Sequence, residues 1–374
     1  MKSWTCTAAL LALSSIPAVE IAGADVQAEA AQPAAAGLIG YWPLRGDCRD
    51  HSGNELHGVN HGVRLEDAAF DGRGAYIEIP ASPKLQLGTG DFTLAAWVHT
   101  GRDIDDVIGD VVSRYDAVGR RGFSLTIKST AGGYSSHGDD RHVYFGVDNG
   151  HEPTWEDCGR PSPTSNYVSN SLTVFDGHLY AAITDAEKFE NWCHVFRYAG
   201  GKQWEDCCRV GDRRTHGVEP MVVHRGSLYA ATWTYEFQTP NEWARVTSLT
   251  TFQGKLFASL GSCTSSRLDA PCDFRGTVWS MEAGHSVSYD RDLGPGWKHL
   301  TAIRRSDRLE LHVNGQLVAT SASFAPADYD LTVDCPLRIG FGEVDYFSGE
   351  IREVRLYRRA LTAGELQRLA ADAP

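Results

Sequence analysis

Hydrophobic and polar residues alternate along residues 309–313, LELHV, with the period of two that is typical of a half-buried β-strand. Asn314-Gly315 follows directly, and this dipeptide accepts the positive φ angles of a type I′ turn. A two-residue turn there joins the strand to a second one over 316–320 and keeps the apolar residues on one face. A sheet with one apolar face needs a second sheet to cover it, so the pattern predicts a sandwich.

Further strands are expected in the first third of the chain. Residues 92–100, FTLAAWVHT, are rich in β-forming residues and apolar on both faces, as in a central strand of a two-sheet stack. The 38 glycines favour turn-rich all-β structure. Only 361–373 has a helical pattern, in which Thr362 and Glu365 form a capping box, so we expect a short C-terminal helix.

A strand–glycine turn–strand unit repeats in the middle of the chain. SLTVFDGHLYAAITD at 171–185 recurs as EPMVVHRGSLYAATWT at 219–234 and as SLTTFQGKLFASLGS at 248–262. Another hairpin is expected over 194–207, about Gly200-Gly201. A unit of two hairpins resembles a kelch-type propeller blade. Three unevenly spaced units are fewer than the four to eight blades of a closed propeller, so we expect a partial array.

The flanking segments carry motifs of a known family. GLIGYWPL, DHSGNELHG, AFDGRGAYIEIP and DFTLAAWV follow one another before the repeats, and GWKHLTAIRRSDRLELHVNGQLV and FSGEIREVRLYRRAL follow them. Their order resembles that of laminin-G-like, concanavalin A-like jelly-roll domains. The resemblance covers about 38–149 and 285–370, and implies two packed antiparallel sheets.

The domain organisation predicted from these patterns is an interrupted jelly roll. Residues 1–24, with the basic Lys2 and an apolar core, read as a secretory leader, which predicts a secreted or extracytoplasmic protein. The predicted segments are a signal peptide over 1–24, a linker over 25–37, the first half of the jelly roll over 38–149, inserted β repeats over 150–284, and the second half of the jelly roll over 285–374.

The net charge of −13 limits the partners. A surface of this sign repels phosphate backbones and anionic lipids, so nucleic acid and membrane surfaces are excluded as expected partners. The apolar core of the leader is too short for a membrane anchor, and no later stretch approaches the length needed to span a bilayer. Neutral ligands or cations suit this charge, while the oligomeric state stays open.

Eight cysteines remain once Cys6 is removed with the leader, and an even number in an exported chain favours disulfides. With Gly200-Gly201 as a two-residue turn, Cys193 lies opposite Cys208, which predicts a bridge between them; a bulge would put Cys207 in place of Cys208. The remaining predicted pairs are Cys158 with Cys207, Cys263 with Cys272, and Cys48 with Cys335.

A calcium ion is the cofactor that the resemblance implies, because laminin-G-like domains often hold one through loop carboxylates and carbonyls. The matching residues are Asp47 and Asp50 in GDCRD and Asp71 in FDG. Arg352 stands where the family pattern has an acidic residue, which weakens this interpretation. The alternative, which we prefer, is that the three carboxylates are turn residues that bind their own backbone.

A polar loop over 132–142, GGYSSHGDDRH, is the candidate ligand-binding segment. Aromatic rings can stack on sugar faces, and carboxylates can hydrogen-bond sugar hydroxyls. The candidate residues are Tyr134, His137, Asp139 and Asp140, and the alternative is a solvated loop. We find no E-x-D-x-E string of the kind that glycosidases on this fold carry, and no nucleophile elbow or metalloprotease motif, so no catalytic residue is assigned.

These observations favour a secreted, non-catalytic binding or adhesion module for extracellular carbohydrate or protein. That expectation rests on the resemblance of the fold, which hosts lectins, enzymes and scaffolds alike. A carbohydrate-active enzyme with carboxylates assembled across loops is the first alternative, and a purely structural surface protein is the second. A carboxylate pair about 5–10 Å apart in an aromatic-lined groove would favour the enzyme.

Overall fold

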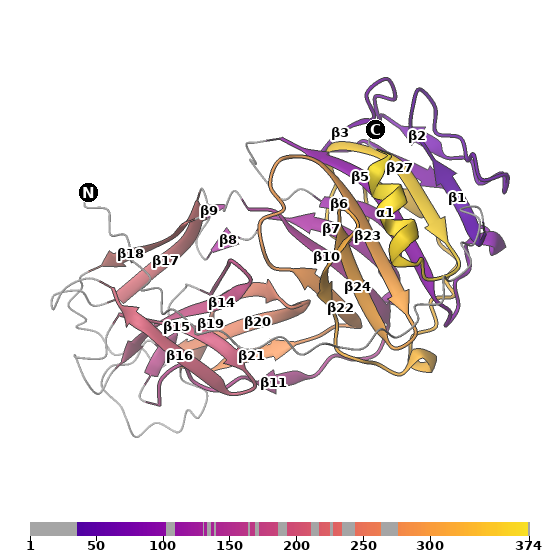
Figure 1. The fold of residues 1–374 in the computed structure, drawn as a ribbon. Coiled ribbons are helices and arrows are strands. Elements are labelled where there is room, and N and C mark those ends of the chain that lie inside the picture. The colour runs from indigo at the N-terminus through magenta and orange to yellow at the C-terminus, as the bar shows by residue number, and fades with distance from the viewer. Residues whose placement is uncertain are drawn as a thin grey trace, which may run out of the picture. The chain divides into compact units, whose positions relative to one another are not determined.

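Strands from both ends of the chain pair with one another in the computed structural model (Figure 1). All described residues lie within the compact unit Ala34–Pro374. The structure describes residues 36–101, 109–129, 131–132, 136–137, 140–163, 165–168, 172–185, 193–210, 217–224, 227–233, 244–262 and 276–372.

Two antiparallel sheets, which we call sheet A and sheet B, combine strands from before and after the repeats. In strand order, sheet A holds β1 (Leu38–Trp42), β27 (Ser348–Tyr357), β5 (Phe92–Thr100), β23 (Gly296–Arg305), β24 (Arg308–Val313) and β25 (Gln316–Thr320), with β3 (Ala69–Asp71) beside β27. Sheet B holds β2 (Val59–His61), β4 (Tyr76–Ile79), β26 (Leu337–Ile339), β6 (Gly109–Asp116), β7 (Arg121–Lys128), β10 (His142–Asn149) and β22 (His285–Tyr289). The predicted all-β, two-sheet sandwich is therefore confirmed.

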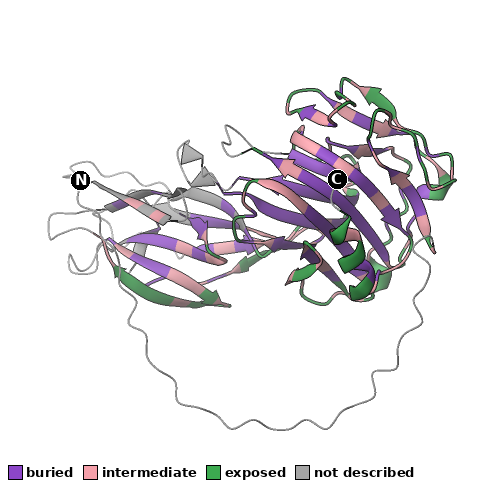
Figure 2. Cartoon of the chain, turned by 45° about the horizontal axis from the view of Figure 1, so that its top comes forward, coloured by how far each residue is buried: buried purple, intermediate pink, exposed green. Residues whose placement is uncertain are grey.

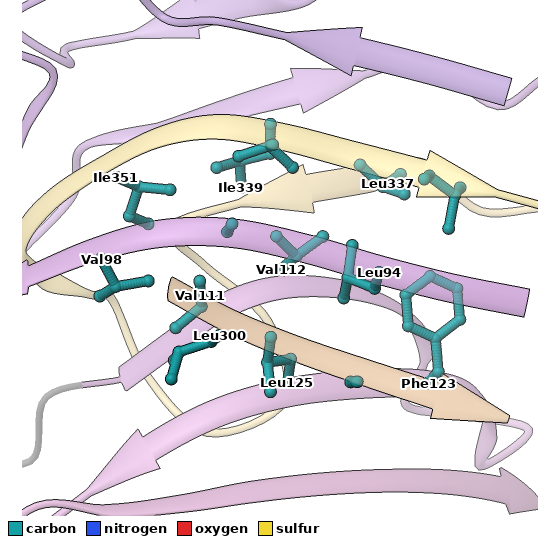
Figure 3. Close-up of a cluster of buried hydrophobic side chains, with 14 of the residues drawn as sticks. Leu94, Val98, Val111, Val112, Phe123, Leu125, Leu300, Leu337, Ile339 and Ile351 are labelled. Atoms are coloured by element: carbon teal, nitrogen blue, oxygen red, sulfur yellow. The ribbon is translucent and has the colours of Figure 1, made fainter. Parts of the chain in front are cut away.

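The core lies between these two sheets and unites both ends of the chain. Figure 3 shows side chains of β5, β6, β7, β23, β26 and β27 gathered in one cluster. Leu94 and Val98 of β5 alternate with outward-facing residues, as the strand period requires. In Figure 2 buried residues run along the strands of both sheets. The members of this core fall within 39–147 and 287–356, so it uses no residue of the repeat segment.

Local features expected from the sequence appear around this core. Asn314 and Gly315 have φ angles of 50° and 74°, and Val313 pairs with Gln316 across the turn. Helix α1 (Ala363–Ala371) begins with the capping box of Thr362 and Glu365. The helix buries Leu366 against Ile303 and Tyr357, and it thereby covers part of sheet A. Two short 3₁₀ helices, η1 (Pro83–Leu85) and η3 (Pro326–Asp328), lie in connecting loops.

The repeats form hairpins of their own. The first is β13 (Thr173–Phe175) with β14 (His178–Asp185), the second β17 (Gly217–His224) with β18 (Ser227–Trp233), and the third β19 (Ala244–Phe252) with β20 (Lys255–Ser262). The first and third hairpins share a separate core cluster that includes Val174, Phe196 and Phe257, whereas Val218 and Met221 of the second belong to another cluster. The first and third hairpins join one sheet with β11 (Trp155–Asp157), β12 (Ser165–Val168), β15 (His194–Gly200), β16 (Gln203–Arg209) and β21 (Val278–Met281).

This shared sheet does not support the kelch-like interpretation. In a propeller each blade is a sheet of four strands that packs on the next blade. Here β20 of the third repeat pairs with β12, which in turn pairs with β14 of the first repeat. Hairpins of different repeats are therefore hydrogen-bonded neighbours in a sheet. The repeated sequence predicts the hairpins correctly, but not how they combine.

The predicted register of the hairpin about Gly200-Gly201 is wrong. The turn lies one residue later, since Gly200 pairs with Gln203, and the register shifts again between Tyr198 and Gly200 and between Val195 and Phe196. Cys208 therefore lies opposite Val195, and the backbone N–H of Val210 donates to the carbonyl of Cys193. Neither Cys207 nor Cys208 lies opposite Cys193, so the local register offers no basis for the predicted bridge.

Two other predicted disulfides are not formed among the described residues. Cys48, Cys158, Cys207 and Cys335 are present as thiols there, which contradicts the pairs Cys48–Cys335 and Cys158–Cys207. The Cys48 thiol instead donates to the carbonyl of Gly58 at 3.0 Å. Cys263 and Cys272 lie outside the described residues, as does the predicted leader. Within the described part of the chain, no helix is long and apolar enough to cross a membrane.

Candidate functional site

The three aspartates predicted for calcium are engaged by nearby backbone. Asp71 accepts hydrogen bonds from three backbone N–H groups that follow it, and these donors lower its pKa. Although burial raises the pKa of Asp50, backbone donors outweigh it and hold the pKa below its usual range. The groups that donate to Asp50 are the N–H of Tyr41, Ser52 and Leu56 and the hydroxyl of Ser52.

Calcium takes six to eight oxygen ligands, and a site on these carboxylates stays a prediction. Asp47 accepts from the backbone N–H of Arg49 at 3.0 Å, which makes it a turn residue like the other two. Among the described residues, no group of three or more His, Cys, Asp or Glu side chains is placed to hold a metal ion. The hydrogen bonds thus support the interpretation of all three as turn residues.

Asp140 is the one candidate of the 132–142 loop whose side chain is described. It is 3 % exposed, and its Oδ2 lies 2.8 Å from Nε2 of His142. This pairing holds Asp140 beneath the surface, whereas a rim residue would face solvent. Tyr134 and Asp139 lie outside the described residues, and His137 is described only by its backbone, in β9 (Ser136–His137), which pairs with β8 (Ala131–Gly132).

The face of sheet B that points away from the core is polar and largely buried; we call it the polar face. In β7, Phe123, Leu125 and Ile127 enter the core, so Ser124 and Thr126 point to the opposite side. Both of these residues are buried, with exposed fractions of 7 % and 3 %. Polar side chains on the outer face of a sandwich are ordinarily solvated, so their burial indicates that other segments cover this face.

Asp110 of β6 organises the centre of the polar face. Its carboxylate is 0 % exposed, and the hydroxyls of Ser124 and Thr126 both donate to Oδ1. The backbone N–H groups of Val344 and Asp345 donate to Oδ2, at 2.7 and 3.1 Å. A buried carboxylate with this many donors is well satisfied, and it fixes the segment 340–347 against sheet B.

Titratable groups with shifted pKa values line the same face. Burial lowers the pKa of Lys128, against the opposing effects of Glu343 and Asp110. Its Nζ lies 5.0 Å from the ring centroid of Tyr144, and burial raises the pKa of that tyrosine well above the ordinary value. Clusters of this kind mark candidate functional sites, although structural networks also produce them.

A cleft opens along β22, at the edge of the polar face, and encloses a volume of about 440 Å³. One wall is formed by Ser286–Arg291, and a second by Val318–Ala322 at the end of β25. The turns of the first and third repeats reach it through Gly177 and Gln253. This volume falls within the range of roughly 300–1,000 Å³ that small-molecule sites occupy. The cleft is thus large enough for a small molecule.

Two repeat turns build the cleft by docking on the same short segment. The N–H of Gly177 donates to the carbonyl of Asp290 at 2.7 Å, and the N–H of Gln253 donates to Asp290 Oδ2 at 2.8 Å. Gly254 donates its N–H to the Ser288 hydroxyl and accepts from the Ser286 hydroxyl, at 2.8 and 2.6 Å. Equivalent positions of two repeats therefore converge on β22 and the residue after it.

Positive φ angles allow both turns to approach so closely. Asp176-Gly177 has φ angles of 47° and 76°, and Gln253-Gly254 has 48° and 76°, which are type I′ values. A Cβ on Gly254 would lie 2.6 Å from the carbonyl carbon of Ser286, a distance that side chains do not tolerate. The glycine of the repeat is therefore required both for its turn and for its contact with β22.

Asp290 is a buried acidic residue at the place where both repeat turns dock. It is 7 % exposed, and burial raises its pKa above the usual range, although hydrogen bonds from Ser288 and Gln253 lower it in part. Around it, Glu282 and Lys255 contribute a carboxylate and an ammonium group to the cleft. Lys255 Nζ also lies 2.9 Å from Glu156 Oε2, and both side chains are solvated enough for the pair to be weak.

Sequence reasoning did not single out the cleft residues. The available signals were the alternation of serines with apolar residues in 285–289, HSVSY, and the repetition of Phe-x-Gly in the two turns. The first signal marks outward-facing polar positions, and the second marks tight turns. Neither signal says that the turns and the strand meet, because that depends on how the two cores pack.

The comparison with protein families finds one match in the second half of the chain. Residues 221–367 match the model of the concanavalin A-like lectin/glucanases superfamily. The matched range contains β22 to β27 and so supplies strands to both sheets, which agrees with the two-sheet sandwich. It also contains the β22 wall of the cleft. No curated protein matches the chain.

Solved structures are similar only at a coarse level. Domain 4 of AbnA, a GH43 extracellular arabinanase from Geobacillus stearothermophilus solved with arabinotriose, is 12% identical with a TM-score of 0.34, over 90% of this chain and 98% of that one. The binding domain of Paraclostridial Mosquitocidal Protein 1 is 13% identical with a TM-score of 0.36, over 90% of this chain. The binding domain of Botulinum neurotoxin DC in complex with SialylT is 8% identical with a TM-score of 0.39, also over 90% of this chain.

The chain spans about half the length of these two binding-domain structures, 52% in each case. At TM-scores this low, none of the similarities assigns a site or a ligand to this chain. Its function therefore has to be inferred from the cleft and the polar face.

Proposed function

We propose that this protein is a non-catalytic, extracytoplasmic binding module for carbohydrate, and that the ligand occupies the cleft along β22. The observation that carries the proposal is a cleft of about 440 Å³ whose lining combines hydroxyl, carboxylate and ammonium groups. Sugars present hydroxyls that both donate and accept, so a lining with both kinds of group suits them.

The chemistry of the lining favours a neutral sugar. Ser286, Ser288 and Thr320 bring hydroxyls to the cleft, and Glu282 and Lys255 bring charges of opposite sign. Asp290 and Arg291 add a second carboxylate and a second cation to the lining, so the charges balance locally. The whole chain carries −13, so an anionic ligand gains little there. Tyr289 also lines the cleft, but its ring packs against the sandwich core, so hydroxyl and charged groups dominate the lining.

The hydrogen bonds of the two cleft carboxylates support binding over hydrolysis. A glycosidase needs one carboxylic acid free to protonate the leaving oxygen and a second carboxylate free to act as base or nucleophile. Both oxygens of Asp290 accept hydrogen bonds from protein groups, namely the Ser288 hydroxyl and the Gln253 N–H. Glu282 accepts from the N–H of Ser286 at 2.9 Å. Asp290 is thus engaged through both of its oxygens, which leaves the cleft without a pair of free carboxylates.

A glycan array with the purified protein tests the proposal, followed by affinity measurements on the best ligand. In the variant Lys255→Ala the affinity should fall roughly 10- to 150-fold, because a hydrogen bond to a charged group contributes roughly 1.5–3 kcal/mol. Lys202→Ala is the matched control: Lys202 Nζ pairs with Asp157 Oδ2 at 2.6 Å, also on the repeat segment, but it is not part of the cleft lining.

Three results would count against the proposal. Absence of glycan binding by the unaltered protein favours a structural role or a protein ligand. Equal losses in the Lys255 and Lys202 variants would show that the cleft is not the binding site. Release of reducing sugar from a bound oligosaccharide would support the alternative of a carbohydrate-active enzyme.

A further inference from the structure

Four aromatic side chains form a ladder at the opposite edge of sheet B from the cleft. His61 of β2 stacks on Tyr76 of β4, with ring centroids 4.4 Å apart and an interplanar angle of 5°. Phe341 stacks on Tyr346 in the segment after β26, at 4.2 Å and 11°. Tyr76 connects the two pairs through tilted contacts with Phe341 at 5.4 Å and Tyr346 at 6.2 Å. We call these four residues the aromatic ladder.

The aromatic ladder lies outside the sandwich core and stays partly exposed. In β4, Ile77 and Ile79 are buried in the core, so Tyr76 and Glu78 point to the other face. All four ring residues are intermediate in exposure. Two exposed valines lie near the rings. Val59 is on β2 with His61 and is 49 % exposed, and Val344 lies between Phe341 and Tyr346 and is 37 % exposed.

Hydrogen bonds to Asp110 and within the segment fix the stretch that carries Phe341 and Tyr346. Asp110 receives the backbone N–H groups of Val344 and Asp345, and its own N–H donates to the carbonyl of Asp345. Phe347 donates its N–H to the carbonyl of Gly340 and closes the base of the segment. The rings are therefore ordered before any ligand arrives, which reduces the entropy lost on binding.

An ion pair lies beside the rings. Arg338 Nε is 3.2 Å from Glu78 Oε2, and the Arg338 guanidinium lies 5.5 Å from the ring centroid of Phe341. Both side chains are about one-third exposed, at 31 % and 29 %. The pair is neutral as a whole, and its exposed edges can donate to and accept from hydroxyl groups.

We propose that the aromatic ladder is a second carbohydrate site, in which a pyranose ring stacks its C–H face on Tyr346 or Tyr76 and its hydroxyls bond to Arg338 and Glu78. Stacked rings beside a neutral, bifunctional polar pair match the two sides of a sugar, one apolar and one hydroxylated. This second site shares only its class of ligand with the proposed function and does not depend on the cleft.

Packing of the 340–347 segment is the competing explanation of the ladder. Asp110 and the Phe347–Gly340 hydrogen bond already fix that segment. Rings needed only for packing would be buried, as Phe70 and Phe347 are in the neighbouring core. A protein partner would need roughly 800 Å² of interface on this side, and the rings, which are already partly buried, would be only a part of it.

Binding of soluble oligosaccharides, chosen by glycan array and measured by calorimetry, tests the second site. Tyr346→Ala and Tyr76→Ala should each weaken binding of at least one glycan tenfold or more, whereas Tyr346→Phe should retain it. Trp297→Ala is the matched control, since Trp297 is a partly exposed ring on sheet A that lies beside His99 and beneath Arg352. Thermal melts of each variant establish that it is folded.

The outcomes separate the two sites. Loss of at least one glycan in the ladder variants supports the ladder. Normal binding of every glycan by Lys255→Ala contradicts the cleft. Unchanged binding in both tyrosine-to-alanine variants contradicts the ladder, whatever the cleft variants do. A protein that binds no glycan overturns both proposals, and equal loss in Trp297→Ala and the ladder variants overturns the ladder.

Discussion

Replacing Gly254 with alanine should loosen the contact between the third repeat and β22. Gly254 has a φ angle of 76°, and an added Cβ would lie 2.6 and 2.7 Å from the carbonyl carbon and oxygen of Ser286. Ordinary carbon contacts are near 3.5–4.0 Å, so the turn must move away. That movement breaks the hydrogen bonds that Gly254 makes with Ser288 and Ser286.

The expected destabilisation has two parts. Alanine in the left-handed region costs about 1–2 kcal/mol relative to glycine. Loss of two hydrogen bonds, at about 0.5–1.5 kcal/mol each, adds about 1–3 kcal/mol. Gly201→Ala isolates the first part, because Gly201 has a φ angle of 56° in a turn of the same repeat segment and a Cβ added there would meet no atom within 4 Å.

Urea denaturation followed by circular dichroism should place Gly254→Ala about 1–3 kcal/mol below Gly201→Ala in free energy of unfolding. The Gly254 variant should also bind the cleft ligand more weakly, since Gln253 and Lys255 flank the substituted residue. Equal free energies of unfolding for the two variants, within about 0.5 kcal/mol, would refute the docking of this turn on Ser286.

Three further predictions follow from the cores and the buried acids. Deletion of 153–283 should leave a cooperatively melting sandwich, because the core between sheets A and B uses no residue of that range; loss of the cooperative transition in circular dichroism would contradict this. The hydrogen bond from Arg359 lowers the pKa of Glu365 to about 2. The ionised Glu365 therefore contributes at most about 3 kcal/mol to the free energy of unfolding. This contribution is complete above pH ~4.5 and is lost as the pH falls towards 2. Urea unfolding of Glu365→Gln should lack this acid-side loss. Burial raises the pKa of Asp290, so the folded state binds that proton more tightly and stability falls as the pH rises through the raised pKa. Asp290→Asn should therefore lack this fall in stability between pH ~4 and neutral pH, and a fall as large as that of the unaltered protein would contradict this reasoning.

The sequence alone determined the strands, the tight turns and the sandwich. Alternation in LELHV and the dipeptide Asn314-Gly315 are local signals, and local steric preferences are enough to translate them into a strand and a type I′ turn. The capping box of Thr362 and Glu365 is equally local, and it starts α1 as expected. The order of motifs on either side of the repeats indicated that both ends share one core, which the strand order confirms.

Only the tertiary structure decided the register, the joining of the repeats and the sites. The turn of the hairpin lies one residue later than predicted, and with the bulge between Val195 and Phe196 this puts Cys208 opposite Val195. The cleft needs the turn at Gly254 to meet Ser286, and the ladder needs Tyr76 to meet Tyr346. Each of these contacts joins segments far apart in sequence. Their geometry follows from strand pairing and core packing, which no periodicity within a single segment encodes.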